Sequence, residues 1–188
     1  GHWDELCTRL EQALEAANEL GNLADVAVYA HNIALLLHSR GEYEEARKLY
    51  ERSLHIDREL GNQLQVSQSL HNLGALAQDQ GDYDQARKYY ADSYEVIEAF
   101  GVGSIAELMG QLALLAQSQG RYTEAQDLAE QSLAVYQEQE DQLGTARTLR
   151  QLGDLAYAKA DYDEARDFYQ RSLAIAHGVG YRLGIAQA

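Results

Sequence analysis

Proline is absent from this 188-residue chain, and cysteine, methionine and tryptophan each occur once. The single cysteine, Cys7, excludes an internal disulfide framework and any metal site that is built from several cysteines. The absence of proline removes the strongest helix breaker, while Ala, Leu, Gln and Glu, which lose little side-chain freedom in a helix, are abundant. The composition therefore predicts a helical protein without disulfides.

Long apolar runs are also lacking: no stretch approaches the roughly 18 consecutive apolar residues of a membrane span. No signal-peptide pattern opens the chain, so we expect a cytoplasmic location. Basic residues are few, with 15 Lys plus Arg against 30 Asp plus Glu and a formal net charge of −15. This charge disfavours nucleic acid and anionic membrane as partners and favours basic or neutral peptides, although plain solubility explains it equally well.

Catalytic signatures are missing too. The sequence has no Gly-x-x-x-x-Gly-Lys phosphate loop and no His-Glu-x-x-His zinc helix. His31 and His38 lie seven residues apart on one expected helix face, and His71 repeats His31 one period later, but no carboxylate or cysteine completes a ligand set. We therefore expect no enzyme activity, no cofactor and no metal site.

The main positive feature is a tandem repeat of about forty residues. The segment Gly41–Arg47 (Gly-Glu-Tyr-Glu-Glu-Ala-Arg) returns at Gly81–Arg87, from Gly120 with Tyr122 and Ala125, and at Ala160–Arg166. A second phrase is interleaved with it: Leu70-x-x-Leu73-Gly74-x-x-Ala77 returns as Leu149-x-x-Leu152-Gly153-x-x-Ala156. Each period therefore contains two amphipathic segments.

These segments predict antiparallel helix pairs, since one hairpin cannot bury its apolar faces alone and must stack on its neighbours. Glycines after the segments supply left-handed caps, with Gly180 ending the last full helix. The expected helices are 3–20, 22–40, 42–60, 62–80, 82–100, 104–119, 121–139, 142–159 and 161–177, and a tenth begins at 181–188. Leu183 and Ile185 suggest that the stack continues in a longer parent protein.

The order Leu-x-x-Leu-Gly-x-x-Ala, then Gly-x-Tyr-x-x-Ala, then Tyr90 and Ser93, resembles the tetratricopeptide repeat. It is most similar to the long variety of kinesin light chain, Pins-type adaptors and the sensor arms of bacterial STAND-type regulators. The resemblance implies an all-α, right-handed α-solenoid over residues 1–188, a fragment of a longer chain with about four full repeats and partial ends. We expect a half repeat at 1–20, full repeats at 22–60, 62–100, 102–139 and 142–177, and a partial one at 181–188.

Three positions depart from this pattern: Ala160 and Glu140 replace turn glycines, and Ala129 replaces a repeated tyrosine. Small residues at repeated positions, such as Gly74 and Gly153, are expected to let paired helices approach closely. Seven of the thirteen tyrosines occupy the two repeated aromatic positions, and we expect these seven to lie in the core.

In repeats of this type the first helix of each pair lines the concave groove, which the resemblance therefore makes the binding surface. The candidate peptide-binding residues are His31, Asn32, Leu35, His38, His71, Asn72, Gln78, Gln111, Gln117, Arg147, Arg150, Gln151, Asp154 and Tyr157. Among them, two asparagines and two glutamines should form a polar spine that grips the backbone of an extended peptide, similar to the asparagine ladder of some relatives. An ordinary solvated helix face is the alternative.

We therefore expect a protein-interaction module whose groove holds a peptide or helix of a protein partner, with Arg147 and Arg150 as the candidates for an acidic group. The alternative is a ligand- or effector-sensing arm of a bacterial STAND-type signalling ATPase or transcription regulator. Arginine outnumbers lysine twelve to three, which fits a GC-rich bacterial source and leans slightly toward this alternative. Self-association through the end helices is a further alternative.

Overall fold

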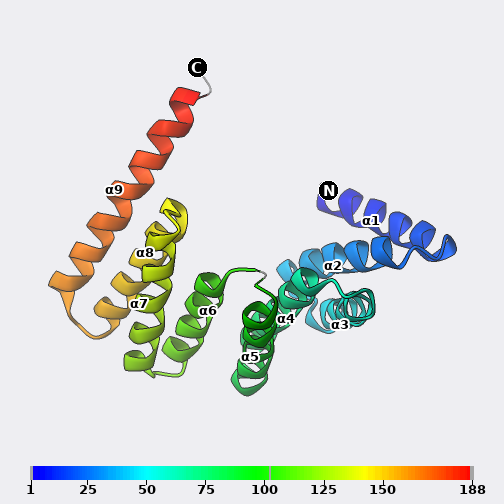
Figure 1. The fold of residues 1–188 in the computed structure, drawn as a ribbon, viewed down its shortest axis with the longest axis horizontal. Coiled ribbons are helices and arrows are strands. Elements are labelled where there is room, and N and C mark those ends of the chain that lie inside the picture. The colour runs from blue at the N-terminus through cyan, green and yellow to red at the C-terminus, as the bar shows by residue number, and fades with distance from the viewer. Residues whose placement is uncertain (1, 102, 187–188) are drawn as a thin grey trace. The chain divides into compact units, whose positions relative to one another are not determined.

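The computed structural model describes residues 2–101 and 103–186, which form nine α-helices and no strand (Figure 1). The helices are α1 (His2–Glu19), α2 (Leu23–Ser39), α3 (Tyr43–Leu60), α4 (Gln63–Asp79), α5 (Tyr83–Phe100), α6 (Ile105–Ser118), α7 (Tyr122–Glu138), α8 (Gln142–Ala158) and α9 (Tyr162–Ala186). The first eight begin and end within one residue of their predicted bounds. The all-α helical-repeat architecture is thus confirmed.

Contacts within the chain divide it into two compact units, Gly1–Gly103 and Ser104–Ala188. In the first unit, α1 packs on the hairpin α2–α3, and α3 packs on the hairpin α4–α5. In the second unit, the hairpin α6–α7 packs on the hairpin α8–α9 through α7 and α8. Each unit therefore contains a stack of two helical hairpins, which the interleaved sequence phrases predict, and the first unit also contains α1.

The end of α9 differs from the prediction. We expected a helix that stops at residue 177 and a separate tenth helix from 181, with Gly180 as the cap between them. Instead α9 continues through Gly178 and Gly180 to Ala186. A glycine costs a helix about 1 kcal/mol relative to alanine but does not forbid it, so glycine alone does not set the boundary. Residues 187–188 lie outside the described residues.

The helix-ending turns use left-handed backbone, as the repeated glycines predict. Gly61 and Gly101 cap α3 and α5 with φ of 72° and 63°. The two positions where the sequence lacks glycine adopt the same conformation, with φ of 55° at Glu140 and 64° at Ala160. The turn geometry is therefore kept where the residue does not favour it.

Small residues and tyrosines build the interior of each hairpin, although the prediction for the tyrosines is only partly right. Tyr50 and Tyr90 are fully buried. Tyr43 and Tyr83 are half-buried, whereas Tyr122, Tyr162 and Tyr169 are exposed, which contradicts the prediction that all seven lie in the core. Tyr162 and Tyr169 belong to α9, and among the described helices only α8 packs extensively against α9.

A serine on the second helix ties the two helices of three hairpins together. Ser93 Oγ donates to the carbonyl oxygen of Ser67 at 3.0 Å, and Ser132 Oγ donates to that of Ala106 at 2.7 Å. Ser172 Oγ makes the same bond to the carbonyl oxygen of Ala146 at 2.7 Å. Donor and acceptor lie 26 residues apart each time, so the bond fixes the register of each hairpin.

Candidate functional site

We define the first-helix face of each unit as its predicted binding residues, which lie on α2 and α4 in the first unit and on α6 and α8 in the second. Their exposure varies widely within each unit. Asn32, Leu35, Arg147, Arg150 and Tyr157 are exposed; His31, His38, His71, Asn72, Gln78, Gln111, Gln117 and Asp154 are half-buried; Gln151 is buried. The exposed members are the ones that can meet a partner without rearrangement.

His31 joins α2 to α4. Its Nε2 lies 3.1 Å from Asn72 Nδ2, and its Nδ1 lies 3.2 Å from Ser69 Oγ. Since an amide nitrogen only donates, Nε2 accepts and Nδ1 carries the proton. Burial lowers the pKa of His31, while the Asp57 carboxylate opposes this shift, so the ring is neutral at neutral pH. The imidazole also meets the Tyr50 ring edge-on, with centroids 5.4 Å apart.

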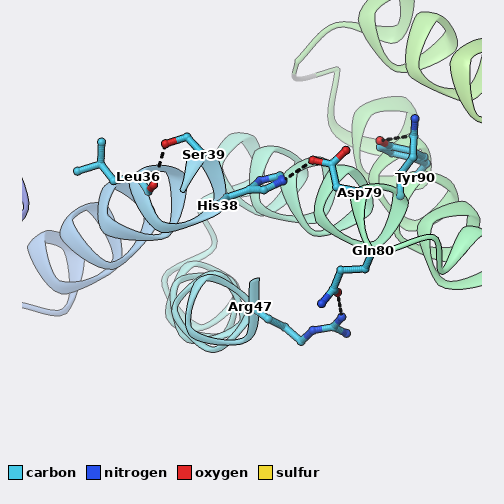
Figure 2. Close-up of polar contacts among 8 residues, drawn as sticks. Leu36, His38, Ser39, Arg47, Asp79, Gln80 and Tyr90 are labelled. Carbon is cyan, nitrogen blue, oxygen red and sulfur yellow. Dashed lines mark hydrogen bonds and ion pairs between the residues drawn. The ribbon is translucent and has the colours of Figure 1, made fainter. Parts of the chain in front are cut away.

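His38 makes a second link between the same two helices. Figure 2 shows its ring directed from α2 toward Asp79 of α4, with Nε2 2.8 Å from the carboxylate oxygen Oδ2. The ring also meets Tyr43 and Tyr50 edge-on, with centroids 5.8 and 6.4 Å apart. Arg47 of α3 reaches Gln80 below α4 in the same view. The polar contacts of this unit thus cross from one hairpin to the next.

The second unit repeats the link at one equivalent position. Gln151 Nε2 of α8 donates to the carbonyl oxygen of Gly110 in α6 at 3.0 Å. The two residues are 41 positions apart, the same separation as between His31 and Asn72 and between His38 and Asp79. In each unit, a side chain of one first helix therefore forms a hydrogen bond with the adjacent first helix.

Other predicted residues are also engaged. Tyr90 Oη donates to Gln78 Oε1 at 3.3 Å, and Tyr169 Oη donates to Asp154 Oδ1 at 2.8 Å. Asp154 Oδ2 additionally lies 3.6 Å from Arg150 Nη1. Both Arg147 and Arg150 are exposed candidates for an acidic group, and the charge of Arg150 is partly neutralised by Asp154.

The predicted polar spine is thus divided in its roles. Asn72 and Gln151 each commit one N–H to the neighbouring repeat, whereas Asn32 is exposed. An amide has two N–H groups and an acceptor oxygen, so Asn72 and Gln151 keep further capacity. Whether they hold a peptide backbone stays a prediction. The sequence did not predict the hydrogen bonds that join them to the neighbouring first helix.

Within the described part of the chain, no group of three or more His, Cys, Asp or Glu side chains is arranged to hold a metal ion. Over the same residues, no helix has both the length and the apolar character needed to cross a membrane.

Two hollows were missed by the sequence analysis. A cavity of about 160 Å³ lies between α2, α3 and α4, and its walls include the buried carboxylate of Asp57. An apolar pocket of about 310 Å³ lies between α8 and α9, beside Tyr157, Tyr162 and Leu173. The signal for the first was present, because Asp57 stands at a repeat position where Ile97, Tyr136 and Ala176 carry no charge.

Comparison with known proteins agrees with the geometry. A family profile described as tetratricopeptide repeat matches residues 1–59, 25–99 and 104–176. No curated protein matches the chain in sequence.

Solved structures share the fold at low sequence identity. BtubC (BKLC) from P. vanneervenii is 22% identical, with a TM-score of 0.80 over 96% of this chain and 75% of its own. Repeats described as a Podosopora anserina kinesin light chain are 20% identical, with a TM-score of 0.72 over 95% of this chain and 89% of theirs. The apo form of RapI is 14% identical, with a TM-score of 0.79 over 94% of this chain and half of its own.

Proposed function

This chain belongs to the tetratricopeptide repeat family, and we propose that it is a non-catalytic interaction module whose first-helix face binds a peptide or helix of a partner protein. The observation that carries the proposal is the set of bonds between residues 41 apart, Asn72 with His31 and Gln151 with Gly110. These bonds hold adjacent first helices in fixed register before any partner arrives. A preorganised surface loses less conformational entropy on binding, which favours affinity.

Exposed residues beside these bonds supply the contacts. In the first unit, Asn32 offers amide donors and an acceptor, and Leu35 is 42% exposed. In the second unit, Leu114 and Tyr157 are 39% and 62% exposed. Apolar anchors among polar groups suit an extended or helical peptide, whose side chains need pockets and whose backbone needs hydrogen bonds. The net charge of −15 favours a basic or neutral partner.

A random peptide library displayed on phage, selected on the purified chain, tests this proposal. We expect selected peptides whose affinity falls about tenfold or more in Asn32→Ala and Leu35→Ala, because truncating a central contact of an interface commonly costs that much. Glu51→Ala, an exposed change on the second helix α3, is the matched control and should bind normally. If the selected peptides bind Asn32→Ala and Leu35→Ala normally but bind Glu51→Ala more weakly, the assignment of the first-helix face is refuted.

A second candidate is the sensing arm of a bacterial STAND-type regulator. The apolar pocket of about 310 Å³ between α8 and α9 supports it, since small-molecule sites begin near that size and are mostly apolar. A nucleotide-binding module encoded upstream in the same gene would favour this role.

The exposed residues Tyr162 and Leu173 beside this pocket also suit self-association, which a light-scattering mass at two protein concentrations would detect.

A further inference from the structure

Asp57 on α3 is a charged side chain inside the first unit. It is 3% exposed, and it lines the cavity between α2, α3 and α4. Its Oδ2 accepts a hydrogen bond from Ser53 Oγ at 3.2 Å, and its Oδ1 accepts one from Asn62 Nδ2 at 3.1 Å. A carboxylate has about four acceptor positions, so these two neutral donors leave part of its hydrogen-bonding capacity for other groups.

The position of Asp57 in the repeat makes it exceptional. The equivalent residues in the next two hairpins are Ile97 and Tyr136, both buried and the first fully apolar. Ser53 departs from its equivalents as well: the other three serines bond to a carbonyl oxygen 26 residues earlier, whereas Ser53 bonds to Asp57. The residue at position 57 has therefore changed, and the serine kept at position 53 holds the new carboxylate instead of a backbone carbonyl.

Within the part of the chain that the structure describes, this carboxylate has no cationic partner. Among the residues that the structure describes, no lysine or arginine forms an ion pair with Asp57. The ionisable group that faces it from α2 is His31, whose imidazole is neutral because burial lowers its pKa. The facing groups from α4 are the neutral amides of Gln65 and Gln68. Burying a charge is costly unless it is paired, so a positive ligand would be strongly favoured here.

The cavity has the size and lining for such a ligand. Its volume of about 160 Å³ far exceeds the roughly 10–15 Å³ of such space that one water needs. Asn32, Gln65 and Gln68 at its walls carry amide oxygens that accept hydrogen bonds. Guanidinium is planar, always charged and carries five N–H donors, so it suits a cavity lined by one carboxylate and several amides better than ammonium does.

We infer that the cavity at Asp57 is a specificity pocket for a cationic side chain, preferentially arginine, of the bound partner. The inference rests on the proposed function, because it assigns one side-chain subsite to the same first-helix face. Asn32 belongs to both the face and the pocket, so a peptide on the face can place one side chain inside.

The test uses N-acetyl-arginine methylamide, titrated into the isotope-labelled chain and followed by amide NMR. We expect saturable shifts at Ser53, Gln65 and Gln68. In Asp57→Asn, which keeps an acceptor oxygen for Asn62 but removes the charge, the affinity should fall about tenfold, as expected for a charged hydrogen bond. Glu98→Gln removes one exposed charge from the same unit and should leave the affinity within about twofold.

A comparison on the unaltered protein does not depend on how the variants fold. N-acetyl-citrulline methylamide has nearly the same shape without the charge, and it should bind about tenfold more weakly. Equal affinities for the arginine and citrulline compounds, or equal affinity in Asp57→Asn, would overturn the inference. Peptides that bind the unaltered protein and Asp57→Asn equally would refute this subsite and leave the proposed function standing. Failure to select any peptide would refute the proposed function and the role of the cavity as a subsite for a peptide, whatever the arginine titration shows.

Discussion

The ring of Tyr90 lies so close to the backbone of Gly74 that a Cβ atom on residue 74 would stand 2.6 Å from Tyr90 Cε1. Tyr90 is fully buried and bonded through its hydroxyl to Gln78, so the ring has little room to retreat. Gly153 has the same relationship to Tyr169 in the second unit, at 2.6 Å. The repeated glycine is therefore explained by aromatic packing between the helices of one hairpin.

Gly74→Ala should destabilise the fold by about 1–3 kcal/mol, because the added methyl group overpacks the interior. Gly110→Ala is the matched change: it is also in a helix, but its Cβ would meet Gln151 Oε1 only at 3.7 Å, an ordinary contact. That variant should gain up to about 1 kcal/mol from helix propensity. Urea unfolding followed by circular dichroism measures both; equal effects would contradict the packing explanation.

The two buried tyrosines predict opposite responses to removal of a hydroxyl. Tyr50 Oη is buried and has no hydrogen-bond partner among the described residues, whereas Tyr90 Oη donates to Gln78. Tyr50→Phe should therefore be neutral or stabilising, and Tyr90→Phe should cost about 0.5–1.5 kcal/mol. Thermal unfolding of the two variants side by side checks the pair. A larger loss in Tyr50→Phe would mean that its hydroxyl has a partner.

The left-handed backbone at Glu140 and Ala160 predicts that glycine stabilises both positions. In this conformation a residue with a side chain costs about 1–2 kcal/mol of stability. Glycine avoids that cost but loses part of the gain, because it gives the unfolded chain more conformational freedom. Glu140→Gly and Ala160→Gly should each raise the free energy of unfolding by about 0.5–1 kcal/mol. Gly120→Ala, with φ of 73°, is the reverse change and should lower it. No gain in either glycine variant would show that the strain is relieved elsewhere.

Stability should also depend on pH through His31. Burial lowers its pKa in the folded protein below the ordinary value of about 6.5, so between the two values the unfolded chain binds the proton more readily. This contribution to stability is complete above about pH 6.5 and is lost as the pH falls through the folded pKa. A protonated Nε2 also cannot accept from Asn72. Urea unfolding at pH 7.5 and 5.5 should show a larger loss for the unaltered protein than for His31→Gln; identical losses would exclude His31 as the cause.

The helices were predictable because each apolar pattern and each turn recurs along the chain. A boundary recognised in one repeat therefore predicts the equivalent boundary in the others. Prediction failed where local chemistry and the repeat disagree. Gly180 looks like a cap but lies within α9, and Ala160 looks unsuited to a left-handed turn but adopts one. At Ala160 the neighbouring helices impose the backbone, and at Gly180 no local rule forbids the helix to continue.

Of the candidate site, the sequence predicted which residues share a helix but not which neighbours they meet. The bond between His31 and Asn72 depends on the rotation of one hairpin relative to the next. Helical periodicity shows which residues share a face of one helix, but it does not give this rotation. Asp57 could have been found by reading each repeat position down the chain for the one charged residue at a position that is otherwise uncharged.

The hydrogen bonds of this protein differ in how they pass through gene duplication. The serine bonds span 26 residues inside one hairpin, so copying a hairpin copies donor and acceptor together. The bonds that span 41 residues join two hairpins, so copying one hairpin alone supplies only one of the two partners. Each such bond therefore depends on residues of two different hairpins, and one junction uses His31 with Asn72 while another uses Gly110 with Gln151.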